Sequence, residues 1–146
     1  MAYQTGAVQA LPDVLYRAEQ VRHLDRVAIE RHGIPGIALM NRAGEAAYRV
    51  LREQWPAERG MTVLAGIGNN AGDGYVMARL GRADGLAVRV LQLGDSARLR
   101  GDAAIACAAY RDAGGAIDAY QRLPADPGVI VDAMFGTGLE RPVEGV

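Results

Sequence analysis

The sequence contains a single cysteine, Cys107, so no disulfide can form within the chain. Phenylalanine and tryptophan occur once each, which leaves little aromatic surface on which nucleic-acid bases could stack. Basic and acidic residues nearly balance at a net charge of −1, so the basic excess of a nucleic-acid-binding protein is missing. The longest uncharged run, residues 60–72, is too short to span a bilayer. We therefore expect a protein that engages neither nucleic acid nor a membrane, in a reducing, cytoplasmic setting.

Length and apolar content predict one globular domain. The chain has 146 residues, half of them hydrophobic, which is enough to bury roughly two-thirds of the surface of the unfolded chain. The N-terminus lacks the basic-then-apolar pattern of a signal peptide. We therefore treat residues 1–146 as a single domain.

The segment at residues 61–80, MTVLAGIGNNAGDGYVMARL, organises the rest of the chain. Its apolar beginning is typical of a strand buried on both faces of a parallel sheet. A turn follows that is rich in glycine, which permits a close backbone approach to a ligand. The apolar residues after the turn predict a helix, whose N-terminus would present unpaired N–H groups to an anion. The expected turn glycines are Gly66, Gly68, Gly72 and Gly74.

Alternating patterns along the remaining chain predict an α/β fold with a mostly parallel sheet. Helices are expected at residues 18–32, 37–54 and 102–113, and strands at 86–93, 116–119 and 129–131. The first two helices would form an N-terminal extension ahead of the first strand. His23 and His32 are interpreted as solvated side chains of the first helix, and Cys107 as a small buried hydrophobic residue.

Polar residues follow two of the predicted strands. Asn69, Asn70 and Asp73 come after the first strand, and Asp132 ends the last one. The carboxyl ends of parallel strands share one edge of a sheet, where ligands bind in such folds. Carboxylate and carboxamide oxygens at that edge suit a group I or II cation.

A redox module is a generic alternative for the same segment. The run from Gly66 to Ala71 fits the dinucleotide fingerprint G-x-G-x-x-G/A after a strand. In that interpretation Asp95, just beyond the second strand, would bind the ribose. The paired Asn69 and Asn70 and the acidic Asp73 are features that this fingerprint does not require.

Several motifs together resemble the NAD(P)H-hydrate epimerases, the YjeF N-terminal domain family. GNNAGDG at residues 68–74 is similar to the family's G-N-N-G-G-D-G turn, and VDAMFGTGL at 131–139 is similar to its V-D-A-x-x-G-T-G-L motif. LMNRAG at 39–44 resembles the family's helix motif ahead of the first strand, and AEQV and LD in the first helix also fit. The resemblance covers nearly the whole chain.

The resemblance implies a Rossmann-like, three-layer α-β-α fold with extra N-terminal helices. It implies an isomerase of metabolite repair, which interconverts the R and S hydrates of NADH and NADPH at C6 of the nicotinamide ring. An ATP- or ADP-dependent dehydratase selective for the S form would be the functional partner or a fused domain. Potassium would be the ion, held by Asn70 and Asp132. The implied substrate-binding residues are Asn69, Asn70, Ala71, Gly72, Asp73, Gly136, Thr137, Gly138, Leu139, Glu140, Arg141 and Pro142.

The chain departs from the family pattern in two places. Ala71 replaces a glycine, which would cost about 1 kcal/mol if the position required a positive φ. The family's next strand and acidic D-x-P-S-G segment have no match before Val146, so we expect a domain truncated at its C-terminus. No catalytic residue is assigned: Asp132 could act as acid or base, or only as an ion ligand. A redox module and a non-catalytic nucleotide-binding protein stay open as alternatives, and the small residues from Ala43 to Ala47 leave a homodimer open.

Overall fold

The computed structural model describes residues 15–137, 139 and 142. Four parallel strands form one sheet in the order β3-β2-β1-β4. The strands are β1 (Gly60–Ala65), β2 (Ala87–Gln92), β3 (Ile117–Ala119) and β4 (Val129–Ala133). The α helices are α1 (Ala18–Glu30), α2 (Gly36–Gln54), α3 (Asn69–Ala83) and α4 (Gly101–Asp112), and a short 3₁₀ helix, η1 (Ser96–Arg98), follows β2. The predicted α/β class, with its parallel sheet and N-terminal helices, is confirmed.

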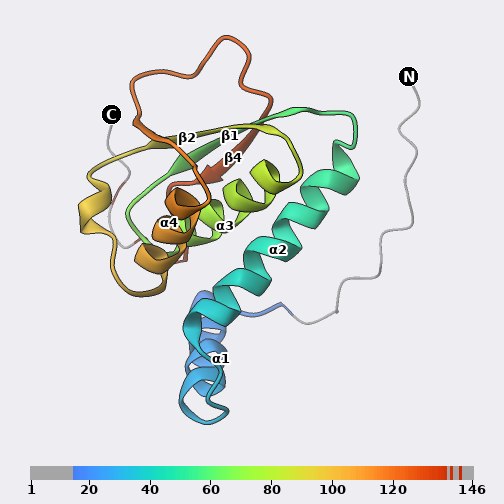
Figure 1. Ribbon diagram of the computed structural model, residues 1–146. Coiled ribbons are helices and arrows are strands. Elements are labelled where there is room, and N and C mark those ends of the chain that lie inside the picture. The colour runs from blue at the N-terminus through green and yellow to red at the C-terminus, as the bar shows by residue number, and fades with distance from the viewer. Residues whose placement is uncertain (1–14, 138, 140–141, 143–146) are drawn as a thin grey trace.

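Helix α3 is the central packing element. It contacts β1, β2 and β4, and it is flanked by α2 and α4 on the same side of the sheet (Figure 1). Of the predicted three-layer arrangement, the described residues form the sheet and this helical layer. The core between the two layers consists of alternate residues of β1 (Met61, Val63 and Ala65) together with buried residues of the helices.

The strand order places the topological switch between β1 and β4. The chain leaves β1 toward β2 and β3 and then returns to the other side of β1 as β4. In α/β sheets, ligands bind outside the carboxyl ends of the strands at such a switch point. Backbone pairing fixes this junction, because the N–H of Gly66 donates to the carbonyl of Ala133 at 3.1 Å.

The boundary between turn and helix differs from the prediction. Helix α3 already begins at Asn69, so Gly72 and Gly74 lie inside the helix rather than in the turn. Their role is close packing: a Cβ on Gly74 would lie 2.7 Å from Cβ of Ala133 and 3.0 Å from Cγ1 of Val63. The turn itself is only Gly66–Gly68, and it is Gly66 that crosses close to the loop after β4, where a Cβ would overlap the carbonyl oxygen of Met134.

Other differences are small. Asp132 lies within β4 rather than after it, because pairing with β1 continues to Ala133. Helix α1 ends at Glu30, and Gly33 with a φ of 63° follows it. The apolar stripe of α1 is not buried, since Val21 is 39% and Leu24 51% exposed. The predicted N-terminal arm, residues 1–12, lies outside the described residues.

Candidate functional site

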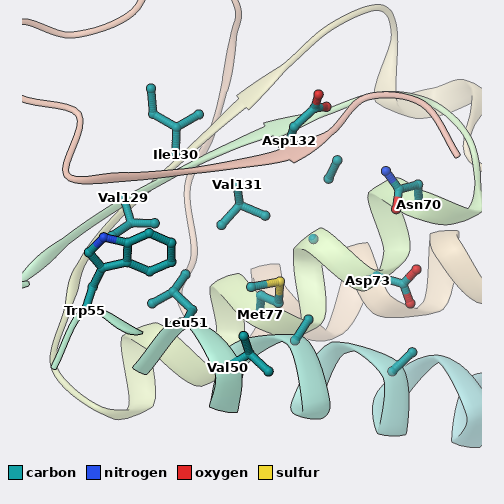
Figure 2. Close-up of a pocket in the computed structure, with 14 residues that line it drawn as sticks. Val50, Leu51, Trp55, Asn70, Asp73, Met77, Val129, Ile130, Val131 and Asp132 are labelled. Atoms are coloured by element: carbon teal, nitrogen blue, oxygen red, sulfur yellow. The ribbon is translucent and has the colours of Figure 1, made fainter. Parts of the chain in front are cut away.

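The two polar motifs meet at one edge of the sheet. Nδ2 of Asn70, in the first turn of α3, donates a hydrogen bond of 2.8 Å to the carbonyl of Phe135, which follows β4. Gly136 lies against the same side chain, because a Cβ there would be 3.2 Å from Cβ of Asn70. Asn70 and Asp132 both line one groove, so the expected meeting of the two motifs is confirmed (Figure 2).

The groove has a polar end and an apolar end. Its volume is about 470 Å³, and it lies between α2, α3 and the strand β4 (Figure 2). Asn70, Asp73 and Asp132 line the polar end, near the carboxyl end of β4. Figure 2 shows the side chain of Asp132 on the face of β4 opposite to Val131, which points toward α2 and α3. The apolar lining comes from α2 and its C-cap, from α3 and from β4; it includes Val50, Leu51, Trp55, Met77, Val129, Ile130 and Val131. Such a shape suits a ligand with a flat or apolar part and a polar or charged part.

Among the titratable groups that line the groove, Asp73 has the most clearly shifted pKa. Burial, followed by repulsion from Asp25 of α1, raises the pKa of Asp73 from 3.8 to about 6. A carboxyl group with such a pKa changes its charge near neutral pH. The structure therefore places a proton-accepting group beside Asn70, on the face of α3 that lines the groove.

Asp132 has a different environment. Its Oδ1 accepts a hydrogen bond of 3.0 Å from the N–H of Met134, and the residue is exposed. This bond orients the carboxylate and leaves its second oxygen for another partner. Asn70 likewise uses its Nδ2 on Phe135, which leaves its Oδ1 available.

The N-terminus of α3 supplies donors of its own. The N-cap residue Gly68 makes no side-chain cap, so the first N–H groups of the helix can bind an anion. Asn69 is exposed at this end. Ala71 and Gly72 are buried, and the N–H of Ala71 donates to the carbonyl of Gly68 at 3.1 Å, so their predicted contact with a substrate stays a prediction. No non-glycine residue in the described part of the chain has a positive φ, so alanine at position 71 is tolerated.

The second predicted binding segment is only partly described. Gly136, Thr137, Leu139 and Pro142 are exposed, and the N–H of Leu139 donates to the carbonyl of Gly136 at 3.2 Å. Gly138, Glu140 and Arg141 lie outside the described residues. Their predicted role in substrate binding stays a prediction.

Residues singled out for other roles lie away from the groove. Asp95 accepts a hydrogen bond of 2.8 Å from the N–H of Ala97 and so caps η1, and it is not among the residues that line the groove. His23 and His32 are exposed, and Cys107 is buried, as predicted. Within residues 15–137, 139 and 142, no three His, Cys, Asp or Glu side chains cluster in a way that could hold a metal ion. None of the described helices is long and apolar enough to cross a membrane.

A buried side chain that the sequence did not single out supports the glycine turn. Nε2 of Gln92, at the end of β2, donates to the carbonyl oxygens of Gly66 at 2.7 Å and Ala65 at 3.1 Å. Its Oε1 accepts from the hydroxyl of Tyr75 on α3. Burial raises the pKa of Tyr75, so the phenol stays protonated and donates. Gln92 therefore ties the end of β1 to β2 and α3, and only its place at a strand end could have hinted at this.

The fold and this edge together define an α/β protein of Rossmann-like topology with a ligand groove at its switch point. The family model described as YjeF-related protein N-terminus matches residues 36–146, and the chain belongs to this family. Fold similarity agrees with this: the crystal structure of yeast ynu0 superposes with a TM-score of 0.76 at 22% identity, over 90% of this chain and 60% of that one.

Curated relatives have a higher sequence identity to this chain than the yeast structure has. The NAD(P)H-hydrate epimerase of Bordetella pertussis strain Tohama I is 43% identical over 130 residues, which cover 88% of this chain and 54% of that protein. The NAD(P)H-hydrate epimerase of Rhodobacter capsulatus is 39% identical, covering 88% of this chain and 64% of its own length. The bifunctional NAD(P)H-hydrate repair enzyme Nnr of Escherichia coli K12 is 41% identical, covering 90% of this chain and 26% of that protein. The chain thus spans between about a quarter and two-thirds of these relatives.

Proposed function

We propose that the protein is an NAD(P)H-hydrate epimerase, an isomerase that interconverts the R and S hydrates of NADH and NADPH at C6 of the nicotinamide ring. The observation that carries the proposal is the shared groove of Asn70, from the first motif, and Asp132, from the second. Family membership and relatives named for this activity support it.

The groove offers suitable partners for each part of such a substrate. Unpaired N–H groups at the start of α3 favour the pyrophosphate. The segment after β4, with Gly136 and Thr137, would close over the ligand from the other side. Inversion at C6 leaves the composition unchanged: either the hydroxyl leaves as water and water returns on the opposite face, or the ring opens and recloses. Both routes need proton transfer beside the ring nitrogen, which a carboxyl group can perform.

The donor set at the polar end fits a potassium ion. Oδ1 of Asn70 and the second carboxylate oxygen of Asp132 are hard ligands that the hydrogen bonds to Phe135 and Met134 leave available. These two residues would hold the ion, and Asp132 would then act as a ligand rather than as an acid or base. When bound, the ion would supply positive charge next to the phosphates and hydroxyls of the substrate.

The reaction places the protein in metabolite repair. An epimerase alone does not regenerate NADH or NADPH, so the proposal includes an ATP- or ADP-dependent dehydratase that consumes the S form. That relatives include bifunctional NAD(P)H-hydrate repair enzymes supports a close link between the two steps. A cytoplasmic setting and a homodimer belong to the same proposal as expectations.

The test is a chiral measurement of turnover with the full protein. The S hydrate is first removed by a purified dehydratase, and the return of the S form is followed by chromatography with and without the protein. We expect the initial rate to exceed the spontaneous rate. Asp132→Asn should lower this excess, whereas Asp112→Asn, an exposed substitution on α4, should not. A return of the S form at the spontaneous rate, with a folded full-length protein, would reject the proposal.

A further inference from the structure

A charged side chain of the N-terminal helix reaches the turn that follows β4. Nη1 of Arg22, on α1, donates a hydrogen bond of 2.7 Å to the carbonyl oxygen of Thr137, which is 115 residues away in sequence. Both residues are exposed, so the bond adds little to the stability of the fold. The bond acts locally, because it holds the backbone of the turn at Thr137.

The same turn is held from its other side by α3. The carbonyl of Phe135 accepts from Nδ2 of Asn70, and Gly136 packs against the Asn70 side chain. Residues 135–137 are therefore held from two sides, by Asn70 of α3 and by Arg22 of α1. These contacts connect α1 and α3 to the segment after β4, at the polar end of the groove.

Helix α1 approaches the groove with its polar face. Asp25 lies three residues after Arg22 and so shares its face of the helix. Its charge adds to the effect of burial in raising the pKa of Asp73, which places that face of α1 near the start of α3. No side chain of α1 is buried, and the helix packs against α2.

We infer that Arg22 is a positioning residue for the substrate site, holding the turn after β4 in the conformation that receives the ligand. The inference rests on the proposed function for the identity of the ligand. A guanidinium bound to a carbonyl makes a charge-assisted hydrogen bond of fixed direction. If the turn is less often in its competent conformation without this bond, apparent affinity falls by the same factor. The chemical step, carried out by other groups, keeps its rate.

Kinetics of three variants in the full protein test this. Arg22→Ala should raise KM for the hydrate of NADPH about two- to tenfold, the range for loss of one hydrogen bond, while kcat changes less than twofold. Arg22→Lys should recover part of the loss, since it keeps the charge but not the fork geometry. Arg26→Ala is the matched control: Arg26 lies one turn along α1, and its side chain makes no hydrogen bond or ion pair with a described residue. Its KM should match that of the wild type.

Hydrogen exchange gives a readout that does not depend on activity. The N–H of Leu139 donates to the carbonyl of Gly136, so its exchange reports on the turn. We expect it to exchange about two- to tenfold faster in Arg22→Ala and at the wild-type rate in Arg26→Ala. The wild-type protein could lack epimerase activity while Leu139 still exchanges faster in Arg22→Ala. That result would reject the proposed function and leave the role of Arg22 in holding the turn standing.

Two results would overturn the inference. One is unchanged Leu139 exchange in Arg22→Ala; the other is an equal rise of KM in Arg26→Ala. If Arg22→Ala unfolds, as judged by circular dichroism, the same measurements on Arg22→Lys decide: wild-type exchange and wild-type KM together would overturn it.

Discussion

The side-chain amide of Asn70 bonds to the backbone of Phe135 at 2.8 Å, and this contact joins two motifs that are 65 residues apart. One motif opens helix α3, and the other follows β4. The amide nitrogen is the donor in this bond, and the oxygen of the same group stays available as a ligand. Asparagine is suited to this position because it offers both functions on one short side chain.

Replacing Asn70 by aspartate separates the two functions. Asn70→Asp keeps an oxygen ligand but places a carboxylate against the carbonyl of Phe135, where no donor remains. We expect the free energy of unfolding to fall by about 1–2 kcal/mol at pH 8, measured by urea denaturation. Asn41→Asp on α2, outside the groove, is the control and should stay within about 0.5 kcal/mol of the wild type. Equal stability of Asn70→Asp and the wild type would show that the contact with Phe135 contributes nothing to folding.

The buried Gln92 should matter more for stability than Asn70. Gln92→Leu would leave the carbonyl of Gly66 and the hydroxyl of Tyr75 without their partner, at a cost of about 2–4 kcal/mol. Gln121→Leu, at an exposed position, is the matched control. Because Tyr75 belongs to the same network, the losses in Gln92→Leu and Tyr75→Phe should be less than additive in a double-mutant cycle. Strict additivity would contradict the network.

The sequence predicted the features that depend on local pattern. Strand, glycine turn and helix follow from the apolar run at Met61 and the glycines after it, and the alternation of strands and helices predicted a parallel sheet. The meeting of Asn70 with the segment after Asp132 followed from one rule, that parallel strands end at a common edge. These successes required no knowledge of side-chain partners.

Features that depend on distant partners could not be predicted in this way. Gln92 sits on a strand whose pattern is ordinary, and its role appears only when β1 lies beside it. Arg22 belongs to the polar face of an amphipathic helix, which usually means solvent, and nothing in its spacing points to Thr137. The apolar side chains of α1 are largely uncovered, and Leu24 is 51% exposed in the described structure. Periodicity indicates which face is apolar, not whether another element covers it.

Asp73 should make stability depend on pH in the acid range. Its pKa is about 6 in the folded protein and 3.8 ordinarily, so the folded state binds its proton more tightly than the unfolded state does. Stability from this group is therefore greatest below pH 4 and is lost as pH rises from about 4 to 6. Asp73→Asn removes the titration. The difference in free energy of unfolding between wild type and Asp73→Asn, measured by urea denaturation from pH 4 to 8, should show this slope.

A second variant checks the cause of the shift. Asp25→Asn removes the negative charge that adds to burial, so the transition in the difference curve should move toward lower pH. Burial alone should keep it above the ordinary value for aspartate. A difference curve without slope between pH 4 and 6 would show that Asp73 is not perturbed.

Potassium binding can be tested apart from catalysis. If Asn70 and Asp132 hold the ion, potassium chloride should raise Tm relative to choline chloride at equal ionic strength, because a ligand that binds only the folded state stabilises it. At a potassium concentration 10 times Kd the gain would be about 1.4 kcal/mol, a shift of several degrees for a domain of this size. Asp132→Asn should abolish most of the difference between the two salts, since it removes the charged ligand. Asp112→Asn should keep it. An equal Tm in both salts for the wild-type protein would remove the ion from the proposal but leave the shared groove, and the epimerase proposal built on it, to be decided by the chiral assay.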